Sequence, residues 1–458
     1  MKQIAGIALI ILMIGCHQQK QSKNTDNTKM ENTSFETVNW AHVSNVYEVN
    51  LRQYTQAGTF SAFAQELPRL KQMGVQTLWF MPITPIAQLN KKGTLGSPYA
   101  CSDYTATNPE FGSIDDFKSL VKKAHDLGFK VIIDWVANHT GWDHVWTKSH
   151  PEYYKKDSTG NFKIASGMDD IIELDYSNPA LRKAMIDAME FWVKQCDIDG
   201  FRCDLAFWVE LDFWKEARTA LEKTKKLFWL GEFDALDKPE YMQVFDASYT
   251  WTWMHQTEQF YKGNIGLDSL RNILEPYDTA GGNNKIKLWF TTNHDENSWN
   301  GTEYEKYGDM AKALAVFSFT WDGIPLIYSG QELPNTKRLQ FFEKDVIAWN
   351  GEYKLADFYN RLLEVREKNP ALRTGDASAK TILLHTDQPN SILAYLRKNG
   401  DKEVLVLLNL SKNDLTFTLQ ENLLKDNYKK VFDDQTVQSL NGRTTFELKP
   451  WGYEVWEK

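Results

Sequence analysis

The chain has 458 residues, of which 42% are hydrophobic and 25% are charged, so it carries enough apolar material for a large folded core. Its length suggests two or three domains, or one large barrel with an accessory domain. The formal net charge of −9 argues against nucleic acid as the main partner, because a phosphate backbone requires a basic surface.

The N-terminus has the features of a targeting segment. Residues 4–15 (IAGIALIILMIG) follow Lys2 and form an apolar run that is too short to span a membrane as a helix. The pattern LMIGC, which ends at Cys16, resembles a bacterial lipoprotein signal in which the cysteine becomes the acylated first residue. A plain secretory signal and a short buried helix are the alternatives. We expect a signal peptide over residues 1–15 and an exported protein whose lipid anchor at Cys16 holds it to the membrane, on the periplasmic face or the cell surface.

The segment that follows, residues 16–38, is polar and predicts a flexible tether. Three further cysteines follow it, Cys101, Cys196 and Cys203, and three thiols cannot build a full disulfide framework in an exported chain. Stability must therefore come from the hydrophobic core.

From residue 45 onward, strand-like and helix-like segments alternate. Continuous apolar strands that alternate with helices indicate a parallel sheet buried on both faces. We count eight strand candidates, each followed by a helix candidate, which fits a closed (β/α)8 TIM barrel better than an open doubly wound sheet. The strand candidates are 45–54, 75–83, 130–136, 198–206, 227–234, 247–252, 285–295 and 324–330, and the helix candidates are 59–74, 113–128, 179–195, 211–225, 238–245, 267–277, 307–321 and 353–368.

Two insertions interrupt the barrel pattern, which we place at residues 39–375. Residues 84–112 are rich in Pro, Gly and Tyr, and residues 138–178, after the third strand, predict a short inserted domain. Loops that follow strands lie on the C-terminal face of such a barrel, where active sites are found. Over residues 376–458, alternating strands and turn signals indicate a C-terminal all-β domain, which we predict to be a β-sandwich.

Charged and polar side chains cluster where several strand candidates end. Arg202 and Asp204 lie two residues apart in one strand, so both point to the same face, and burying such charges is costly unless they are paired or used. Phe201, Cys203 and Leu205 alternate to the other face, where we expect them to pack against outer helices. Three other strand candidates also end in polar residues, and the ends of all four strands are expected to meet at one rim of the barrel. The polar residues at these ends are Asp134, Asn138, His139, Arg202, Asp204, Glu232, His294 and Asp295.

Clustered carboxylates suit two kinds of chemistry. Barrel hydrolases with two metals usually need several histidines, and the first strand (YEVNLRQY) has none. Glycoside hydrolysis needs two carboxyl groups, of which one attacks the sugar or activates water and the other protonates the leaving oxygen. A structural ion pair in the barrel core is the alternative for Arg202 and Asp204, and structural roles are the alternative for His139 and His294 taken singly.

Four short motifs and two flanking segments occur in the order and at the spacing of one enzyme family. DWVANH (134–139), GFRCD (200–204), LGEF (230–233) and TTNHD (291–295) resemble the signature regions of the α-amylase family of retaining glycoside hydrolases, glycoside hydrolase family thirteen. SPYACSDYTATNPEFGS after the second strand and IIELDYSNP at the end of the insertion are also similar to that family. The resemblance extends over roughly residues 45–458 and implies the barrel, the inserted domain and the C-terminal β-domain.

The resemblance also implies a role for individual residues of the motifs. Asp204 would be the nucleophile that forms a covalent glycosyl-enzyme, and Arg202 would hold it ionised. Glu232 would be the general acid and then the general base, with its pKa raised by nearby Asp204 and Asp295. Asp295 would also stabilise the transition state. The residues implied in substrate binding are Tyr99, Asp134, His139, Arg202 and His294.

The match to the family loosens at two places. Phe207 and Trp208, the third and fourth residues after Asp204, differ from the pairs that many α-amylases, neopullulanases and cyclomaltodextrinases carry, so the substrate subclass stays open. Many relatives bind a structural calcium, for which Asn138 and Asp175 are the candidate ligands here. Calcium requires six to eight oxygen ligands, and a hydrogen-bonded Asn138 without metal is the alternative. No cofactor is expected for the chemistry itself.

The resemblance therefore implies an enzyme that cleaves the α-1,4-glucosidic bonds of starch or maltooligosaccharides by double displacement, with retention of configuration. Its partners would be the α-glucan substrate and, through the lipid anchor, the membrane. One alternative is a cyclomaltodextrinase-like or neopullulanase-like, α-1,6-active or transglycosylating relative with the same residues. Another is a non-catalytic glycan-binding lipoprotein, against which the intact set of Asp204, Glu232 and Asp295 argues.

Overall fold

The computed structural model describes residues 35–282, 285–420, 423–433 and 435–458. The predicted signal peptide, Cys16 and most of the predicted tether lie outside these ranges. Among the described residues, no helix has the length and apolar character needed to span a membrane.

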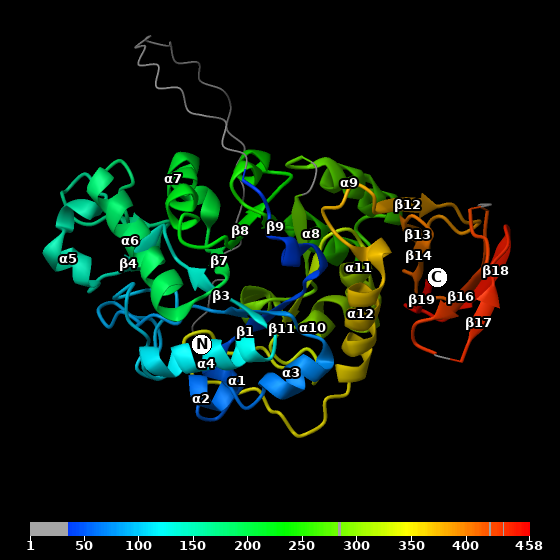
Figure 1. Ribbon diagram of the computed structural model, residues 1–458, viewed down its shortest axis with the longest axis horizontal. Coiled ribbons are helices and arrows are strands. Elements are labelled where there is room, and N and C mark those ends of the chain that lie inside the picture. Colours follow the sequence, from blue (N-terminus) through cyan, green and yellow to red (C-terminus); the bar gives the residue numbers. More distant parts are fainter. Residues whose placement is uncertain (1–34, 283–284, 421–422, 434) are drawn as a thin grey trace, which may run out of the picture. The chain divides into compact units, whose positions relative to one another are not determined.

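Eight parallel strands close into a barrel, which confirms the predicted fold class (Figure 1). The ring closes where β11 pairs with β1, with Ile327 opposite Tyr47. In their order round the barrel, the strands are β1 (Val46–Val49), β2 (Thr77–Phe80), β3 (Lys130–Trp135), β7 (Gly200–Cys203), β8 (Phe228–Asp234), β9 (Ala247–Tyr249), β10 (Ile286–Trp289) and β11 (Ile324–Tyr328).

Helices connect most of the barrel strands. The first long one, α4, begins at a capping box in which Ser113 and Asp116 each accept a backbone N–H of the other, and its apolar face is buried. The helix predicted at 238–245 is wrong, because β8 and β9 are joined by a short 3-10 helix, η4 (Pro239–Gln243), in a connection with room for one or two turns only. The α-helices of the barrel are α1 (Leu51–Tyr54), α2 (Phe60–Phe63), α3 (Leu67–Met73), α4 (Ile114–Asp126), α6 (Pro179–Cys196), α7 (Leu211–Leu221), α8 (Trp251–Tyr261), α9 (Leu267–Thr279), α10 (Glu303–Tyr307), α11 (Ala311–Thr320) and α12 (Ala356–Lys368).

The insertion after β3 forms a small three-stranded antiparallel sheet in the order β4-β6-β5. Its first strand begins only a few residues after β3 ends, so the sheet starts at the C-terminal rim of the barrel. Its elements are β4 (His139–Gly141), α5 (Val145–Ser149), η2 (Pro151–Tyr153), β5 (Ile164–Ala165) and β6 (Met168–Glu173).

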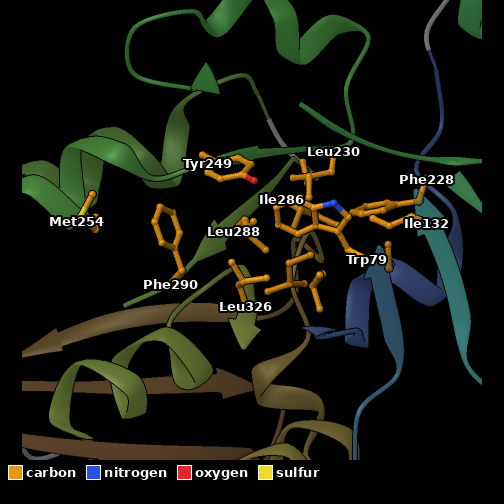
Figure 2. Packing of buried hydrophobic residues seen from close by; sticks show 14 residues of the cluster. Trp79, Ile132, Phe228, Leu230, Tyr249, Met254, Ile286, Leu288, Phe290 and Leu326 are labelled. Atoms are coloured by element: carbon orange, nitrogen blue, oxygen red, sulfur yellow. The ribbon is translucent and has the colours of Figure 1, made fainter. Parts of the chain in front are cut away.

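Apolar side chains from many strands fill the inside of the barrel (Figure 2). Ile132 on β3 and Leu230 on β8 are fully buried in this cluster. Because side chains alternate along a strand, the next inward positions on these strands are Asp134 and Glu232. The barrel therefore has an apolar filling, and a charged layer lies above it at the C-terminal rim.

The C-terminal strands form an all-β domain of two antiparallel sheets, coloured orange to red in Figure 1. A six-stranded sheet has the order β12-β13-β14-β19-β16-β17, and β15 pairs with β18 in a second sheet. Tyr395 on β13 packs edge-on against Trp321, which follows α11, with ring centroids 4.9 Å apart. The strands are β12 (Lys380–Leu384), β13 (Ile392–Asn399), β14 (Lys402–Asn409), β15 (Leu415–Leu419), β16 (Asn427–Lys430), β17 (Val437–Ser439), β18 (Thr444–Leu448) and β19 (Tyr453–Glu457).

Gly200 allows β7 to lie close to β8 just below the charged layer. It is paired with Phe228, and a Cβ at this glycine would lie only 2.1 Å from the Phe228 carbonyl oxygen. No side chain fits at that distance. The glycine therefore sets the position of Arg202, which is the next inward residue of β7.

We expect Gly200→Ala to lower the free energy of unfolding by about 1–3 kcal/mol, because the added methyl group overpacks the barrel. The midpoint of thermal or urea denaturation, followed by circular dichroism, measures the effect. Gly266→Ala is the matched control, since a Cβ there meets no atom within 4 Å and the residue has a φ of −89°. Equal midpoints for the two variants would contradict the packing argument.

Candidate active site

The strand-end residues predicted from the sequence meet around one cleft at the C-terminal rim of the barrel. The cleft has a volume of about 390 Å³, a size that suits a small ligand or a piece of a larger one. Five of the predicted residues line it, namely Tyr99, His139, Asp204, Glu232 and Asp295. The other residues that line it are Lys92, Ser97, Met168, Asp170, Ile171, Leu205, Trp299, Phe341 and Phe342.

Arg202 is fully buried and contacts three carboxylates that come from the ends of three strands. Its Nη1 lies 2.9 Å from Asp134 Oδ1 and 2.9 Å from Asp204 Oδ1, and its Nη2 lies 2.9 Å from Glu232 Oε2. Its Nε donates a hydrogen bond of 3.1 Å to the Tyr249 hydroxyl. Buried charges are tolerated only with such partners, so this one cation fixes the three acids relative to one another.

Asp204 directly follows β7, and its backbone N–H donates to the Trp135 carbonyl oxygen at 3.0 Å. Burial raises the pKa of Asp204 to about 6 against the opposing effect of Arg202, and Asp134 and Asp295 add to the rise. The carboxyl group is therefore largely ionised at neutral pH, with its charge paired to the guanidinium.

Glu232 lies on β8 and is the most weakly acidic carboxyl group of the three. Burial raises its pKa to about 7 against the opposing effect of Arg202, and Asp204 and Asp295 raise it further. Repulsion by the two acids was expected from the sequence, but burial is the larger cause. The Leu205 N–H donates to Oε2 at 2.8 Å, the same oxygen that faces Arg202, which leaves Oε1 to carry a proton.

Leu205 is the residue that holds Glu232 from the backbone, and it does so in a strained conformation. Its φ of 41° and ψ of 47° are left-handed, which costs on the order of 1–2 kcal/mol for a residue with a side chain. The expectation that Leu205 packs against outer helices is wrong, because the chain turns at this residue and Leu205 lines the cleft. Phe201 and Cys203 are fully buried.

An ion pair and a chain of hydrogen bonds link Asp295 to Arg202 through His294, Tyr99 and Asp134. Burial alone would lower the pKa of His294, but Asp295 and Glu48 raise it to about 9, so both ring nitrogens donate at neutral pH. Nδ1 contacts Glu48, and Nε2 lies 2.7 Å from the Tyr99 hydroxyl and 3.3 Å from Asp295 Oδ2. The Tyr99 hydroxyl donates in turn to Asp134 Oδ2 at 3.0 Å, and Asp134 also pairs with Arg202.

His139 offers the cleft a neutral imidazole. Burial lowers its pKa to about 4, and Nδ1 lies 3.3 Å from the Asn138 side-chain nitrogen. Its Nε2 is buried without a hydrogen-bond partner among the described residues. A buried polar atom without a partner is costly, so a ligand hydroxyl that reaches His139 would satisfy it.

Calcium binding by Asn138 and Asp175 stays a prediction, and the two residues do not line the same hollow. Asp175 Oδ1 accepts the Ser177 N–H at 3.1 Å and the Ser177 hydroxyl at 2.7 Å. Glu173 lines a hollow with Asn138, but Lys155 and Lys163 pair with its two oxygens at 2.6 and 2.7 Å. Throughout the described part of the chain, no group of three or more His, Cys, Asp or Glu side chains could hold a metal ion.

The two positions at which the sequence departs from the family motif come shortly after Leu205, which lines the cleft. Trp208 lines the separate hollow that contains Asn138, with a volume of about 320 Å³. Phe207 is half-buried, and its carbonyl oxygen accepts a bond from the Tyr241 hydroxyl at 3.3 Å. Neither residue is among those that line the main cleft.

Several residues of the site were not identified from the sequence. Glu48 was missed because it lies in the first strand among apolar residues, although a carboxylate at an inward strand position is a usable signal. Trp299 was missed although it follows Asp295 by four positions in the same loop. Lys92, Phe341 and Phe342 lie in long loops, where no periodic pattern exists to identify them.

Comparison with known proteins identifies the family. Residues 20–166 and 153–375 match the model described as alpha amylase, catalytic domain, and residues 382–455 match the one described as maltogenic amylase, C-terminal domain. The solved structure of the maltogenic alpha-amylase AmyB from Thermotoga neapolitana is 31% identical with a TM-score of 0.83, and the alignment covers 91% of this chain and 98% of that one.

Curated relatives are more distant in sequence. Alpha-amylase MalA from Haloarcula japonica is 27% identical over 397 residues, and cyclomaltodextrinase from Thermoanaerobacter pseudethanolicus is 24% identical over 412 residues. These alignments cover 83% and 82% of this chain, and 57% and 67% of the two relatives, so the chain spans only part of their length.

The match over the catalytic domain and the likeness to AmyB along nearly the whole of that chain agree with the barrel and its rim of carboxylates. The chain belongs to the α-amylase family and is a glycoside hydrolase.

Proposed function

We propose that this enzyme hydrolyses α-1,4-glucosidic bonds of starch or maltooligosaccharides by double displacement, with retention of the α configuration. The observation that carries the proposal is the pair of carboxyl groups, Asp204 and Glu232, which share one buried guanidinium at the cleft and have pKa values of about 6 and about 7. At a pH between these two pKa values, Asp204 is mainly ionised, as a nucleophile must be, and Glu232 is mainly protonated, as an acid must be.

In the first step, the Asp204 carboxylate attacks the anomeric carbon and the bond from this carbon to the glycosidic oxygen breaks. Glu232 transfers its proton to that oxygen, and the sugar on its far side leaves as an alcohol. Asp295 stabilises the positive charge that develops on the sugar ring. The products are a glycosyl ester on Asp204 and an ionised Glu232.

In the second step, Glu232 takes a proton from water while the water oxygen attacks the anomeric carbon and the ester bond to Asp204 breaks. Two inversions give overall retention. In each step one negative charge passes between Asp204 and Glu232, and both contact Arg202. The guanidinium therefore faces the same total charge before and after each step.

A second candidate function uses the same residues on a different bond or acceptor. Relatives that match this chain include a cyclomaltodextrinase and a neopullulanase. Phe207 and Trp208 differ from the residue pairs that such relatives carry, and Trp208, at the hollow beside Asn138, supports a distinctive leaving-group side. Product analysis on maltoheptaose, pullulan and cyclodextrin separates hydrolysis of α-1,4 bonds from α-1,6, cyclic or transfer activity.

The proposed mechanism predicts that maltoheptaose first yields the α-anomer of its products, as followed by NMR before mutarotation. Glu232→Gln should lower kcat on maltoheptaose by about 10²–10⁴-fold, the usual contribution of a general acid. The matched control is Glu216→Gln on α7, an exposed carboxylate that pairs with Arg182 and should leave kcat unchanged. Initial release of the β-anomer, or equal kcat values for wild type and Glu232→Gln, would contradict the proposed mechanism.

The pH dependence of kcat/KM should be bell-shaped. Protonation of Asp204 below about pH 6 removes the nucleophile, and ionisation of Glu232 above about pH 7 removes the acid. Because the two groups interact, the acid and alkaline limbs of the pH profile report the pKa values of the coupled pair. With α-maltosyl fluoride, whose leaving group needs no proton, the alkaline limb should disappear. An alkaline limb that is the same for both substrates would exclude Glu232 as the acid.

We also propose that Cys16 carries the lipid anchor that the sequence pattern LMIGC indicates. In a bacterial host that processes lipoproteins, wild-type protein should then partition into the detergent phase of a non-ionic detergent extraction. Cys16→Ser should carry no acyl groups, because no thiol remains to be acylated. Mass spectrometry of the N-terminal peptide tests the modification directly, and a wild-type peptide without the added mass of acyl groups on Cys16 would contradict acylation at this residue.

A further inference from the structure

A row of aromatic rings leads from Tyr99 along one wall of the cleft. The Tyr99 and Phe341 rings are nearly parallel, with an interplanar angle of 17° and centroids 6.1 Å apart. Trp299 follows, with its ring centroid 5.3 Å from that of Phe341, and 52% of this residue is exposed. Such a wall offers flat apolar surface to sugar rings beyond the bond that is cleaved.

An ion pair joins the loop after β2 to the inserted domain at the edge of the same cleft. Lys92 Nζ lies 3.0 Å from Asp170 Oδ1 and 3.0 Å from Asp169 Oδ1, both on β6. Asp170 is 5% exposed and lines the cleft together with Lys92, whose side chain stays 36% exposed, so only the carboxylate of this pair is shielded from water. Asp169 is exposed and contributes little, as is usual for surface pairs.

The aromatic row and the ion pair belong to one continuous edge of the cleft. In this subsection the word rim means this edge and not the whole C-terminal rim of the barrel. The Leu95 N–H donates to the Phe342 carbonyl oxygen at 3.1 Å, and the Thr94 N–H donates to Glu343 Oε1 at 2.9 Å. A Cβ on Gly93 would lie 2.6 Å from the Phe342 Cβ, so the two segments are in direct contact. The rim therefore runs from Trp299 to Lys92 and on to the inserted domain.

Short helix α1 holds this rim in place from below. The Gln53 side chain donates to the carbonyl oxygens of Gln340 and Glu343 at 3.0 and 2.7 Å and accepts the Asp345 N–H. Arg52 Nη1 donates to the Gly96 carbonyl oxygen at 3.1 Å. Both sides of the rim are thus tied to residues that directly follow β1.

The rim lies opposite the proposed acid. Two of the rim loops follow β11 and β2, the neighbours of β1, and the third follows β10, which lies next to β11, whereas Glu232 lies on β8, across the barrel from β1. The acid protonates the leaving oxygen, so the leaving sugars extend on the side of Glu232. The sugars that stay bound to the nucleophile must extend toward Tyr99, Phe341 and the rim.

We propose that the Lys92–Asp170 pair closes this side of the cleft, so that the enzyme binds the non-reducing end of an α-glucan chain and releases short fragments from it. This inference rests on the proposed function. Lys92 is paired to two carboxylates and does not provide a free cation for a phosphorylated sugar, which favours a neutral chain end as the ligand at the rim.

The test uses two forms of maltoheptaose, one with a free non-reducing end and one blocked there by an ethylidene group across O4 and O6. Consumption of each is followed by chromatography. Wild type should consume the free-ended form at least about tenfold faster, because the blocked end clashes with the closed rim. Lys92→Ala should narrow this difference several-fold by opening the rim.

Two variants serve as controls. Lys92→Arg keeps a cation that can pair with Asp170 and should retain the wild-type preference. Lys91→Ala removes the neighbouring lysine, whose Nζ contacts Gln88 Oε1 at 2.8 Å and which is not among the lining residues, and it should also retain the preference. Thermal midpoints equal to that of wild type establish that each variant is folded.

Equal consumption of the two forms by wild type would overturn the inference while leaving the proposed hydrolysis intact. A strong preference that Lys92→Ala leaves unchanged would overturn the assignment of the barrier to this ion pair. If neither form is consumed, the proposed function and the inference both fall.

Discussion

One fully buried guanidinium determines how the rest of the site is built. Three carboxylates from three strands contact Arg202, and without it they would be unpaired anions in a barrel that excludes water. Arg202 can contact all three carboxylates only because β3, β7 and β8 are neighbours in the ring and Gly200 lets β7 and β8 approach closely. The site therefore depends directly on the fold, since the charged layer lies on top of the apolar filling and requires both the strand order and the close approach at Gly200.

Sharing one cation also makes the two proposed catalytic carboxyl groups dependent on each other. Burial raises the pKa of both, and Arg202 opposes the rise in both. Asp204 adds to the rise in the pKa of Glu232, and Asp295 adds to the rise in both. In a double displacement the negative charge alternates between Asp204 and Glu232, and a fixed guanidinium in contact with both needs no rearrangement as it does so.

The sequence was sufficient to predict the barrel, the C-terminal β-domain and the meeting of the strand-end carboxylates, because each rests on a local pattern repeated in order. Asp204 and Glu232 could be identified since a charge in an apolar strand is conspicuous. Trp299 and Lys92 could not, because their positions depend on how long loops cross the barrel rim. The role of Asp175 stays a prediction, because its place in the chain suggested a calcium ligand while one oxygen of its carboxylate accepts bonds from Ser177.

The attachment of the rim to α1 has a consequence for exchanging parts between relatives. The loop that carries Phe341 is held by Gln53, which lies almost three hundred positions earlier in the chain, just after the first strand. A chimera that transplants this loop alone would leave behind the side chain that shapes it, and the aromatic wall would lose its support. The unit of specificity in this barrel is therefore discontinuous in sequence, and recombination at a single crossover point cannot transfer it.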